Sequence, residues 1–183
     1  MAHRTTAGIV IALLVLGVSA AWSADIVVEG ESYSSIKASM TKIADSTASK
    51  GYCVGIPLRR PHATTETGPG DDGHAVYKIR VGVAGTYQLW VRAYWHDACG
   101  NSFFVLVDST SVNTKTPYVT DQTFRKWHWV AGPTIRLSEG VHTIRFQNRE
   151  DGAKLDQWML TTKPKNRWVP VRVQDETREA IVK

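Results

Sequence analysis

Alternation of side-chain character runs without a break through the stretch Thr86-Tyr87-Gln88-Leu89-Trp90-Val91-Arg92-Ala93-Tyr94. In an extended strand, successive side chains point to opposite faces of the sheet. One face of this strand would carry Tyr87, Leu89, Val91 and Ala93, and the other Gln88, Trp90, Arg92 and Tyr94. We therefore predict a strand with one face in the core and one face that is polar and aromatic.

Further short apolar segments, separated by Gly, Pro, Asp and Ser, recur on both sides of this stretch. Two tight turns that contain glycine, at residues 83–86 and 138–141, each lead into such a segment. This pattern is typical of a β-sandwich made of many short antiparallel strands. Long loops are expected at residues 59–73 and 108–123, where a binding site would lie at the rim. Strands are predicted at residues 26–29, 75–81, 86–94, 102–108, 134–137, 142–148 and 155–161.

The first residues have the layout of a secretory signal peptide. His3 and Arg4 precede an apolar run at residues 8–18, and small residues follow at 19–21. The run is too short to cross a bilayer comfortably, so we expect cleavage and no stable membrane insertion afterwards, although an uncleaved anchor is the alternative. The predicted organisation is a signal peptide at 1–24, one sandwich domain at 25–164 and a tail at 165–183. The protein is then secreted, periplasmic or held at the cell surface.

The charge and the cysteine content of the chain limit the classes of partner that it can have. The formal net charge of +5 is spread along the chain, with no basic block longer than Arg59-Arg60, which argues against a nucleic-acid partner and leaves an acidic polysaccharide open. Cys53 and Cys99 would enter an oxidising compartment, where they either form a disulfide or remain buried thiols. No paired Cys and His spacing points to zinc.

Three of the seven tryptophans fall in segments typical of loops or strand ends, namely Trp95, Trp127 and Trp129. An indole face beside hydrogen-bonding groups suits a sugar ring, whose C–H bonds are apolar and whose hydroxyls need partners. We expect Trp129 to be buried and Trp95 and Trp127 to bind. His96 and Asn101 follow Trp95 in one short segment, which favours a ligand rim, or alternatively a turn that Asn101 caps.

Five segments together resemble carbohydrate-binding modules of families 6 and 35. They are Val28-Glu29-Gly30-Glu31-Ser32-Tyr33, Gly85-Thr86-Tyr87-Gln88-Leu89-Trp90-Val91-Arg92, Lys126-Trp127-His128-Trp129, Leu137-Ser138-Glu139-Gly140-Val141-His142-Thr143-Ile144 and Lys154-Leu155-Asp156-Gln157-Trp158. The resemblance covers residues 26–162, nearly the whole predicted domain. It implies an all-β, jelly-roll β-sandwich of the galactose-binding-like type that binds polysaccharide without cleaving it.

The resemblance also implies a structural calcium ion. In these modules two glutamates of the first strand and one aspartate of the last strand hold the ion, and Glu29, Glu31 and Asp156 match those positions. Glu29 and Glu31 are two residues apart, so in a strand both carboxylates face one side, where they would repel each other without a cation. A solvated acidic strand edge is the alternative.

For the sugar site, the resemblance implies one aromatic residue at the end of strand 86–94 and another before strand 134–137. Tyr94 or Trp95 matches the first position, and Trp127 matches the second. The family usually has an asparagine where this chain has Lys154, and Arg149 lies shortly before it. A cation there suits a carboxylate or sulfate, so an acidic sugar is expected, with Arg149 and Lys154 as selectors. The alternative for Arg149 is an ion pair within a polar turn.

Two other classes of function remain open. His96, His128 and several acids supply groups that a polysaccharide lyase or glycosidase would need, but none lies in a nucleophile, zinc or phosphate-loop motif, so an enzyme is not favoured. The same aromatic residues would also suit a protein-binding adhesion module. Modules of this kind usually accompany a catalytic domain, so two arrangements are open: the protein acts alone, or it associates with a separate polysaccharide-degrading enzyme.

Overall fold

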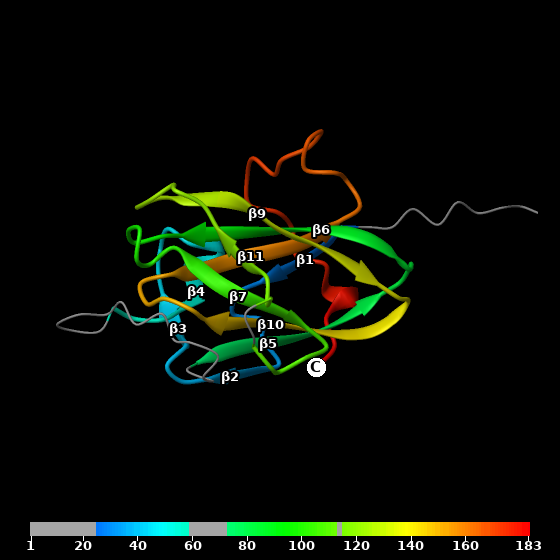
Figure 1. The fold of residues 1–183 in the computed structure, drawn as a ribbon, viewed down its shortest axis with the longest axis horizontal. Helices are drawn as coiled ribbons and strands as arrows, with labels where there is room; N and C mark the ends of the chain where they lie inside the picture. The colour runs from blue at the N-terminus through cyan, green and yellow to red at the C-terminus, as the bar shows by residue number, and fades with distance from the viewer. Residues whose placement is uncertain (1–24, 59–72, 113–114) are drawn as a thin grey trace, which may run out of the picture.

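Two antiparallel β-sheets pack face to face in the computed structural model, which describes residues 25–58, 73–112 and 115–183 (Figure 1). The predicted signal peptide lies outside the described residues. Sheet A has six strands in the order β3-β4-β11-β6-β9, with β1 also paired to β11, and sheet B has five in the order β2-β5-β10-β7-β8. The sheet A strands are β1 (Ile26–Glu29), β3 (Thr41–Ala44), β4 (Tyr52–Gly55), β6 (Gly85–Tyr94), β9 (Trp127–Leu137) and β11 (Lys154–Thr161). Sheet B contains β2 (Ser35–Lys37), β5 (His74–Val81), β7 (Ser102–Val107), β8 (Tyr118–Thr120) and β10 (Gly140–Asn148).

The predicted β-sandwich and all seven predicted strands are confirmed. Because each predicted strand supplies one apolar row, the two sheets bury those rows against each other. Gly140 begins β10 with a φ of 135°, a conformation that side chains rarely adopt, as expected for the turn at residues 138–141. The sequence missed the short strands β2, β3, β4 and β8, and it started β9 at Thr134 instead of Trp127. Those short segments are only three or four residues long, too short to show a clear alternation, and each forms a strand by pairing with a neighbour: β2 with β5, β3 with β4, β4 with β11 and β8 with β7.

The core lies between the sheets and is rich in aromatic residues. Trp158 of β11 packs edge-on against Tyr77 of β5, with ring centroids 5.3 Å apart, and its ring is tilted against that of Phe146 of β10 at 5.8 Å. The hydroxyl of Tyr77 donates a hydrogen bond to the carbonyl oxygen of Gly30, at 2.7 Å. Strand β6 buries the predicted row of Tyr87, Leu89, Val91 and Ala93 in this core.

The two cysteines are free in the structure. Cys53 is buried in β4, where burial raises the pKa of its thiol to about 12, and Cys99 is exposed in the turn after β6. None of the helical segments in the described part of the chain is long and apolar enough to span a bilayer. Of the predicted long loops, residues 59–72 lie outside the described residues, and residues 108–123 contain β8.

After β11 the chain turns back over sheet A. In Figure 1 the orange segment rises above β9 and β6, and the red end then runs down to the opposite sheet. There, Ile181 forms an isolated bridge with Ile79 of β5 after a 3-10 turn, η2 (Arg178–Ala180). The tail predicted at residues 165–183 is therefore docked on the sandwich, and it borders the surface that carries the candidate site.

Candidate functional site

An aromatic pair lies on the outer face of sheet A, the face turned away from sheet B. Tyr94, the last residue of β6, is directly opposite Trp127, the first residue of β9. Their ring centroids are 5.7 Å apart and the rings are inclined by 64°. Both side chains are half-buried, so each keeps part of its ring accessible. The structure thus brings together two of the residues that the sequence predicted for sugar binding.

Two groups hold Trp127 in place. Its indole N–H donates a hydrogen bond to the Thr47 hydroxyl at 2.9 Å, from the loop between β3 and β4. The guanidinium carbon of Arg92 lies 5.3 Å from the centre of its ring, a cation–π arrangement. Arg92 is two residues before Tyr94 in β6 and therefore shares its face. Alternation along the strand predicted that Arg92 lies on the polar and aromatic face, but Arg92 was not among the predicted site residues.

Lys154 stands beside the aromatic pair. It begins β11 opposite Tyr94, and its ammonium lies 5.1 Å from the centre of the Tyr94 ring and 3.0 Å from a carboxylate oxygen of Asp45. Burial raises the pKa of Asp45, but hydrogen bonds from Thr47 and Lys154 outweigh it and hold this pKa below its ordinary value. Lys154 therefore stands at the edge of the pair and already has one carboxylate partner.

The prediction that Trp95 stacks on a ligand is wrong. Trp95 is fully buried; its indole N–H donates to Asp121 at 3.1 Å, and its ring packs against Phe103 at 5.7 Å. Because side chains alternate along a strand, the residue after an outward-facing Tyr94 must face inward. The alternation of the preceding residues carried this signal, and continuing it by one residue would have excluded Trp95.

Asn101 is buried and holds the turn after β6, the alternative considered for it, instead of forming a ligand rim. Its backbone N–H donates to Glu150 at 3.0 Å, and its side-chain amide donates to the carbonyl oxygen of Asp121 at 2.9 Å. His96 starts the same turn, where its backbone N–H donates to the carbonyl oxygen of Gly100 and its ring lies 3.9 Å from the Asp97 carboxylate.

Arg149 is not part of the Lys154 site. Its guanidinium donates to the Ser102 hydroxyl at 2.7 Å, pairs with Glu150, and lies 4.6 Å from the centre of the Tyr118 ring on sheet B. Arg149 follows β10 of sheet B, whereas Lys154 begins β11 of sheet A, and the turn between them crosses from one sheet to the other. Closeness in sequence therefore did not bring the two cations together.

A cluster of carboxylates borders the aromatic pair. A β-bulge in β11 places two successive side chains, Asp156 and Gln157, against partners on the outer face. Asp156 is fully buried, accepts the backbone N–H of Ser49 at 2.7 Å and pairs with Arg92. Arg92 thus contacts both this cluster and the ring of Trp127.

Glu29 is also buried, and three groups donate to one of its oxygens. They are the amide of Gln157 at 2.8 Å, the hydroxyl of Ser49 at 3.1 Å and the ammonium of Lys50 at 3.2 Å. The second oxygen of Glu29 and one oxygen of Glu31 are buried without a hydrogen-bond partner. An unpaired buried oxygen of this kind is costly, so it marks a place where a partner is expected.

The three predicted calcium ligands influence one another. Burial raises the pKa of the Glu31 carboxyl, and the nearby charges of Glu29 and Asp156 raise it further. Burial also raises the pKa of Asp156, against the lowering effect of Arg92. Among the residues that the structure describes, no three acidic, His or Cys side chains converge as a ready metal site. The two unpartnered oxygens nevertheless fit a hard cation in their chemistry, because calcium prefers oxygen ligands.

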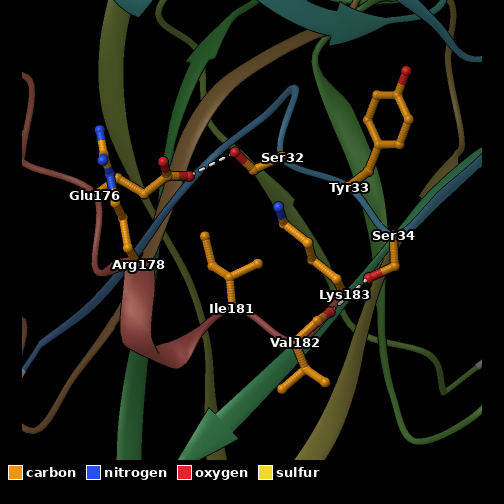
Figure 2. Close-up of a pocket in the computed structure, with 8 residues that line it drawn as sticks. All are labelled: Ser32, Tyr33, Ser34, Glu176, Arg178, Ile181, Val182 and Lys183. Carbon is orange, nitrogen blue, oxygen red and sulfur yellow. Dashed lines mark hydrogen bonds between the residues drawn. The ribbon is translucent and has the colours of Figure 1, made fainter.

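Two hollows lie beside this face, and residues of the C-terminal tail line both of them. A hollow of about 350 Å³ lies at the junction of the loop that carries Ser49 and Lys50 with residues 173–176, and Glu29 lines it. A larger one, of about 710 Å³, lies between residues 32–34 and residues 176–183. Figure 2 shows that Glu176 closes one side of the larger hollow through its hydrogen bond with Ser32.

Comparison with solved structures shows the fold of carbohydrate-binding modules of families 6 and 35. The family 35 module from Clostridium thermocellum aligns with a TM-score of 0.54 and 19% identity, over 74% of this chain and 98% of that one. The family 6 module of Cellvibrio mixtus lichenase 5A, solved with cellotriose, gives 0.55 and 15%, over 78% and 99%. The Podospora anserina GH26-CBM35 mannanase gives 0.57 and 16%, and the chain spans 28% of its length. No family model and no curated protein matches by sequence.

Proposed function

We propose that this protein is a secreted, non-catalytic carbohydrate-binding protein whose Tyr94 and Trp127 rings stack on a sugar. One observation carries the proposal: the two rings lie side by side on the outer face of sheet A, partly accessible, with the cations Arg92 and Lys154 next to them. Rings of this kind bind the apolar face of a pyranose, and the cations bind polar substituents. Two of the structural neighbours are themselves carbohydrate-binding modules, and the chain spans nearly their full length.

The proposed ligand is a polysaccharide with acidic sugar residues. Arg92 and Lys154 each already have a carboxylate partner within the protein, so each can share its remaining N–H donors with a ligand. A uronate carboxylate above Tyr94 would approach the Lys154 ammonium, which is an arrangement that a neutral sugar does not use. The catalytic role is left to a separate polysaccharide-degrading enzyme, and modules of this fold occur within enzymes such as the mannanase.

The proposal includes a structural calcium ion held by Glu29, Glu31 and Asp156. The two unpartnered carboxylate oxygens of Glu29 and Glu31 support it. Calcium would supply positive charge to carboxylates that burial and mutual repulsion destabilise. The protein's own residues, Arg92 at Asp156 and Lys50 at Glu29, already neutralise part of this charge.

Affinity electrophoresis in gels that contain pectate, xylan or cellulose tests the function. Trp127→Ala is expected to abolish retention by the polysaccharide that retards the wild-type protein, with an unchanged circular dichroism spectrum. Tyr118→Ala is the matched control, because Tyr118 is an exposed aromatic residue on sheet B. Retention that survives Trp127→Ala would reject the aromatic pair as the site. New reducing ends, or the absorbance of unsaturated uronates, would reject the non-catalytic role.

A further inference from the structure

The outer face of sheet A continues beyond the aromatic pair into a second group of aromatic side chains that the tail covers. Val27, Trp90 and Met159 form a buried apolar cluster there, and Trp129, Ala131 and Trp168 pack against it. Trp90 is only 4% exposed although it faces away from the core between the sheets. We call residues 163–177 the strap, because this segment of the tail supplies the cover.

The strap is held by side chains along its length. The Trp168 ring packs edge-on against Trp90 with centroids 6.5 Å apart. Farther along, the buried Gln157 accepts the backbone N–H of Gln174 at 3.0 Å and donates to its carbonyl oxygen at 2.8 Å. Thr177 holds the end of the strap: its N–H donates to the carbonyl oxygen of Val27 at 2.9 Å, and its hydroxyl accepts the N–H of Val27 at 3.2 Å and donates to the carbonyl oxygen of Asp25 at 3.0 Å. These contacts join segments far apart in sequence.

Glu176 forms the charged part of this attachment. Its carboxylate accepts the Ser32 hydroxyl at 2.6 Å, the backbone N–H of Glu29 at 3.2 Å and the ammonium of Lys50 at 3.1 Å. Although burial raises the pKa of Glu176, these donors outweigh it and hold the pKa below its ordinary value. Figure 2 shows the Glu176 carboxylate pointing to Ser32 from the start of the final segment.

Trp129 links the covered cluster to the aromatic pair. It is two residues after Trp127 in β9, so both indoles are on the same face, about 7 Å apart along the strand. Trp129 also lies opposite Arg92. Its indole N–H is donated to the carbonyl oxygen of Arg172 in the strap, at 2.9 Å. Trp129 was expected to be buried; it is instead half-buried, as Trp127 is, so the strap takes up its polar group and leaves part of its ring accessible.

We propose that the strap limits the length of the ligand, because it occupies the indole N–H of Trp129 and keeps a saccharide on Trp127 from extending onto that ring. On the opposite side, the loop that carries Asp45 and Thr47 is fixed to Lys154 and Trp127, so the accessible platform ends there as well. A bound saccharide then contacts Tyr94 and Trp127 and stops at the strap. This inference rests on the proposed function, and it adds to it a preference for short ligands or chain ends.

Isothermal titration calorimetry with trigalacturonate and hexagalacturonate tests the inference, with cellotriose and cellohexaose as the neutral pair. The wild-type protein is expected to bind the two lengths of a series equally. The variant Trp168→Ala/Thr177→Val removes two attachments of the strap and leaves Glu176 in place. It should bind the hexasaccharide about five- to tenfold more tightly than the wild type does, the contribution of one aromatic contact, with no change for the trisaccharide. Hydrogen exchange at the amide of Gln174, which donates to Gln157 in the closed strap, reports whether the strap has opened.

Trp129→Ala supplies the second comparison. In the wild-type protein, this change should leave the affinity for either length unchanged, because the strap keeps the saccharide off Trp129, and in the strap variant it should remove the gain for the hexasaccharide. Loss of affinity on Trp129→Ala alone would overturn the inference, as would an opened strap without any gain. If hydrogen exchange shows that the strap remains closed in the variant, the affinity measured for Trp129→Ala in the wild-type background decides whether the inference holds.

The proposed function fails in a different way. If neither the wild-type protein nor the strap variant binds any of the four oligosaccharides, carbohydrate binding at this face is rejected, and the role of the strap is rejected with it. If the wild type binds and Trp127→Ala abolishes the binding, while length and strap have no influence, the proposed function stands and only the inference about the strap is wrong.

Discussion

Two aromatic regions lie on the same face of sheet A and differ in what covers them. Tyr94 and Trp127 stand at one end with cations beside them, and both remain partly accessible. Trp90 lies farther along the same strand, under the strap and nearly inaccessible. Both regions take aromatic residues from alternate positions of β6 and β9, so the type of residue does not distinguish them. Cover by the chain, and not composition, therefore separates the part of this face that is open to a ligand from the part that stabilises the fold.

The largest effect is expected from truncating the covered region. Trp90→Ala removes a ring packed against Trp168 and the cluster around Met159, and it should lower the free energy of unfolding by about 3 kcal/mol or more. Trp127→Ala should cost about 1 kcal/mol, mainly its hydrogen bond to Thr47. Urea unfolding followed by circular dichroism measures both. Equal losses would mean that the two regions do not differ in their role in stability.

Calcium removal should have the next largest effect, because the carboxylate cluster lies beside both regions. At a free calcium concentration of about 100 times Kd, the ion would stabilise the fold by about 2.7 kcal/mol. Differential scanning calorimetry with and without a chelator should show a lower melting temperature after chelation. A melt that chelation does not change would mean that Arg92 and Lys50 neutralise the cluster alone.

The same cluster predicts the direction of the pH dependence. The pKa of Glu31 is raised in the folded protein, so without metal its contribution to stability is fully present below the unfolded pKa and is lost as the pH rises through the folded value. Calcium needs the deprotonated carboxylate, so its stabilising effect should be larger at pH 7 than at pH 5. Melting temperatures at the two pH values measure this, with Glu31→Gln as the control that should remove the difference. An effect of calcium that is larger at pH 5 would contradict the assignment of Glu31.

A smaller effect should come from Tyr94, which is the second ring of the accessible region. Tyr94→Ala should weaken glycan binding about five- to tenfold, because one stacking face is lost while Trp127 remains. Tyr94→Phe should bind almost as well as the wild type, since the ring is retained. Calorimetry with the oligosaccharide that the wild type binds best makes the comparison. Binding that depends on the hydroxyl and not on the ring would exclude stacking at Tyr94.

The smallest effect concerns the charge beside the pair. Lys154→Met keeps the length of the side chain and removes the ammonium, so affinity for galacturonate oligosaccharides should fall about threefold, as for a partly exposed ion pair. Affinity for a neutral oligosaccharide should not change. Both affinities are measured at low and at moderate salt concentration, because only the contribution of the ammonium should depend on salt. A loss that is equal for neutral and acidic ligands would assign Lys154 a purely structural role.

Much of the fold could be predicted because the signal is local. Each predicted strand alternates on its own, and the apolar row of β6 was assigned residue by residue. The pairing of Tyr94 with Trp127 also agrees with the expected positions of two aromatic residues. Trp95 was misplaced although alternation from Leu89 onward already assigns it to the inner face. Arg149 was grouped with Lys154 because the two are close in sequence, and the change of sheet between β10 and β11 separates them.

The spacing of neighbouring residues was enough to predict the alternating strands, the turns between them and the supply of aromatic, acidic and basic side chains. Which of these side chains remain accessible depends instead on contacts between distant segments. The loop with Thr47 holds Trp127, the bulge in β11 brings Asp156 to Arg92, and the strap reaches Trp129 from 43 positions later in the chain. Such contacts depend on how distant segments pack together, and a local pattern of residues carries no record of that packing.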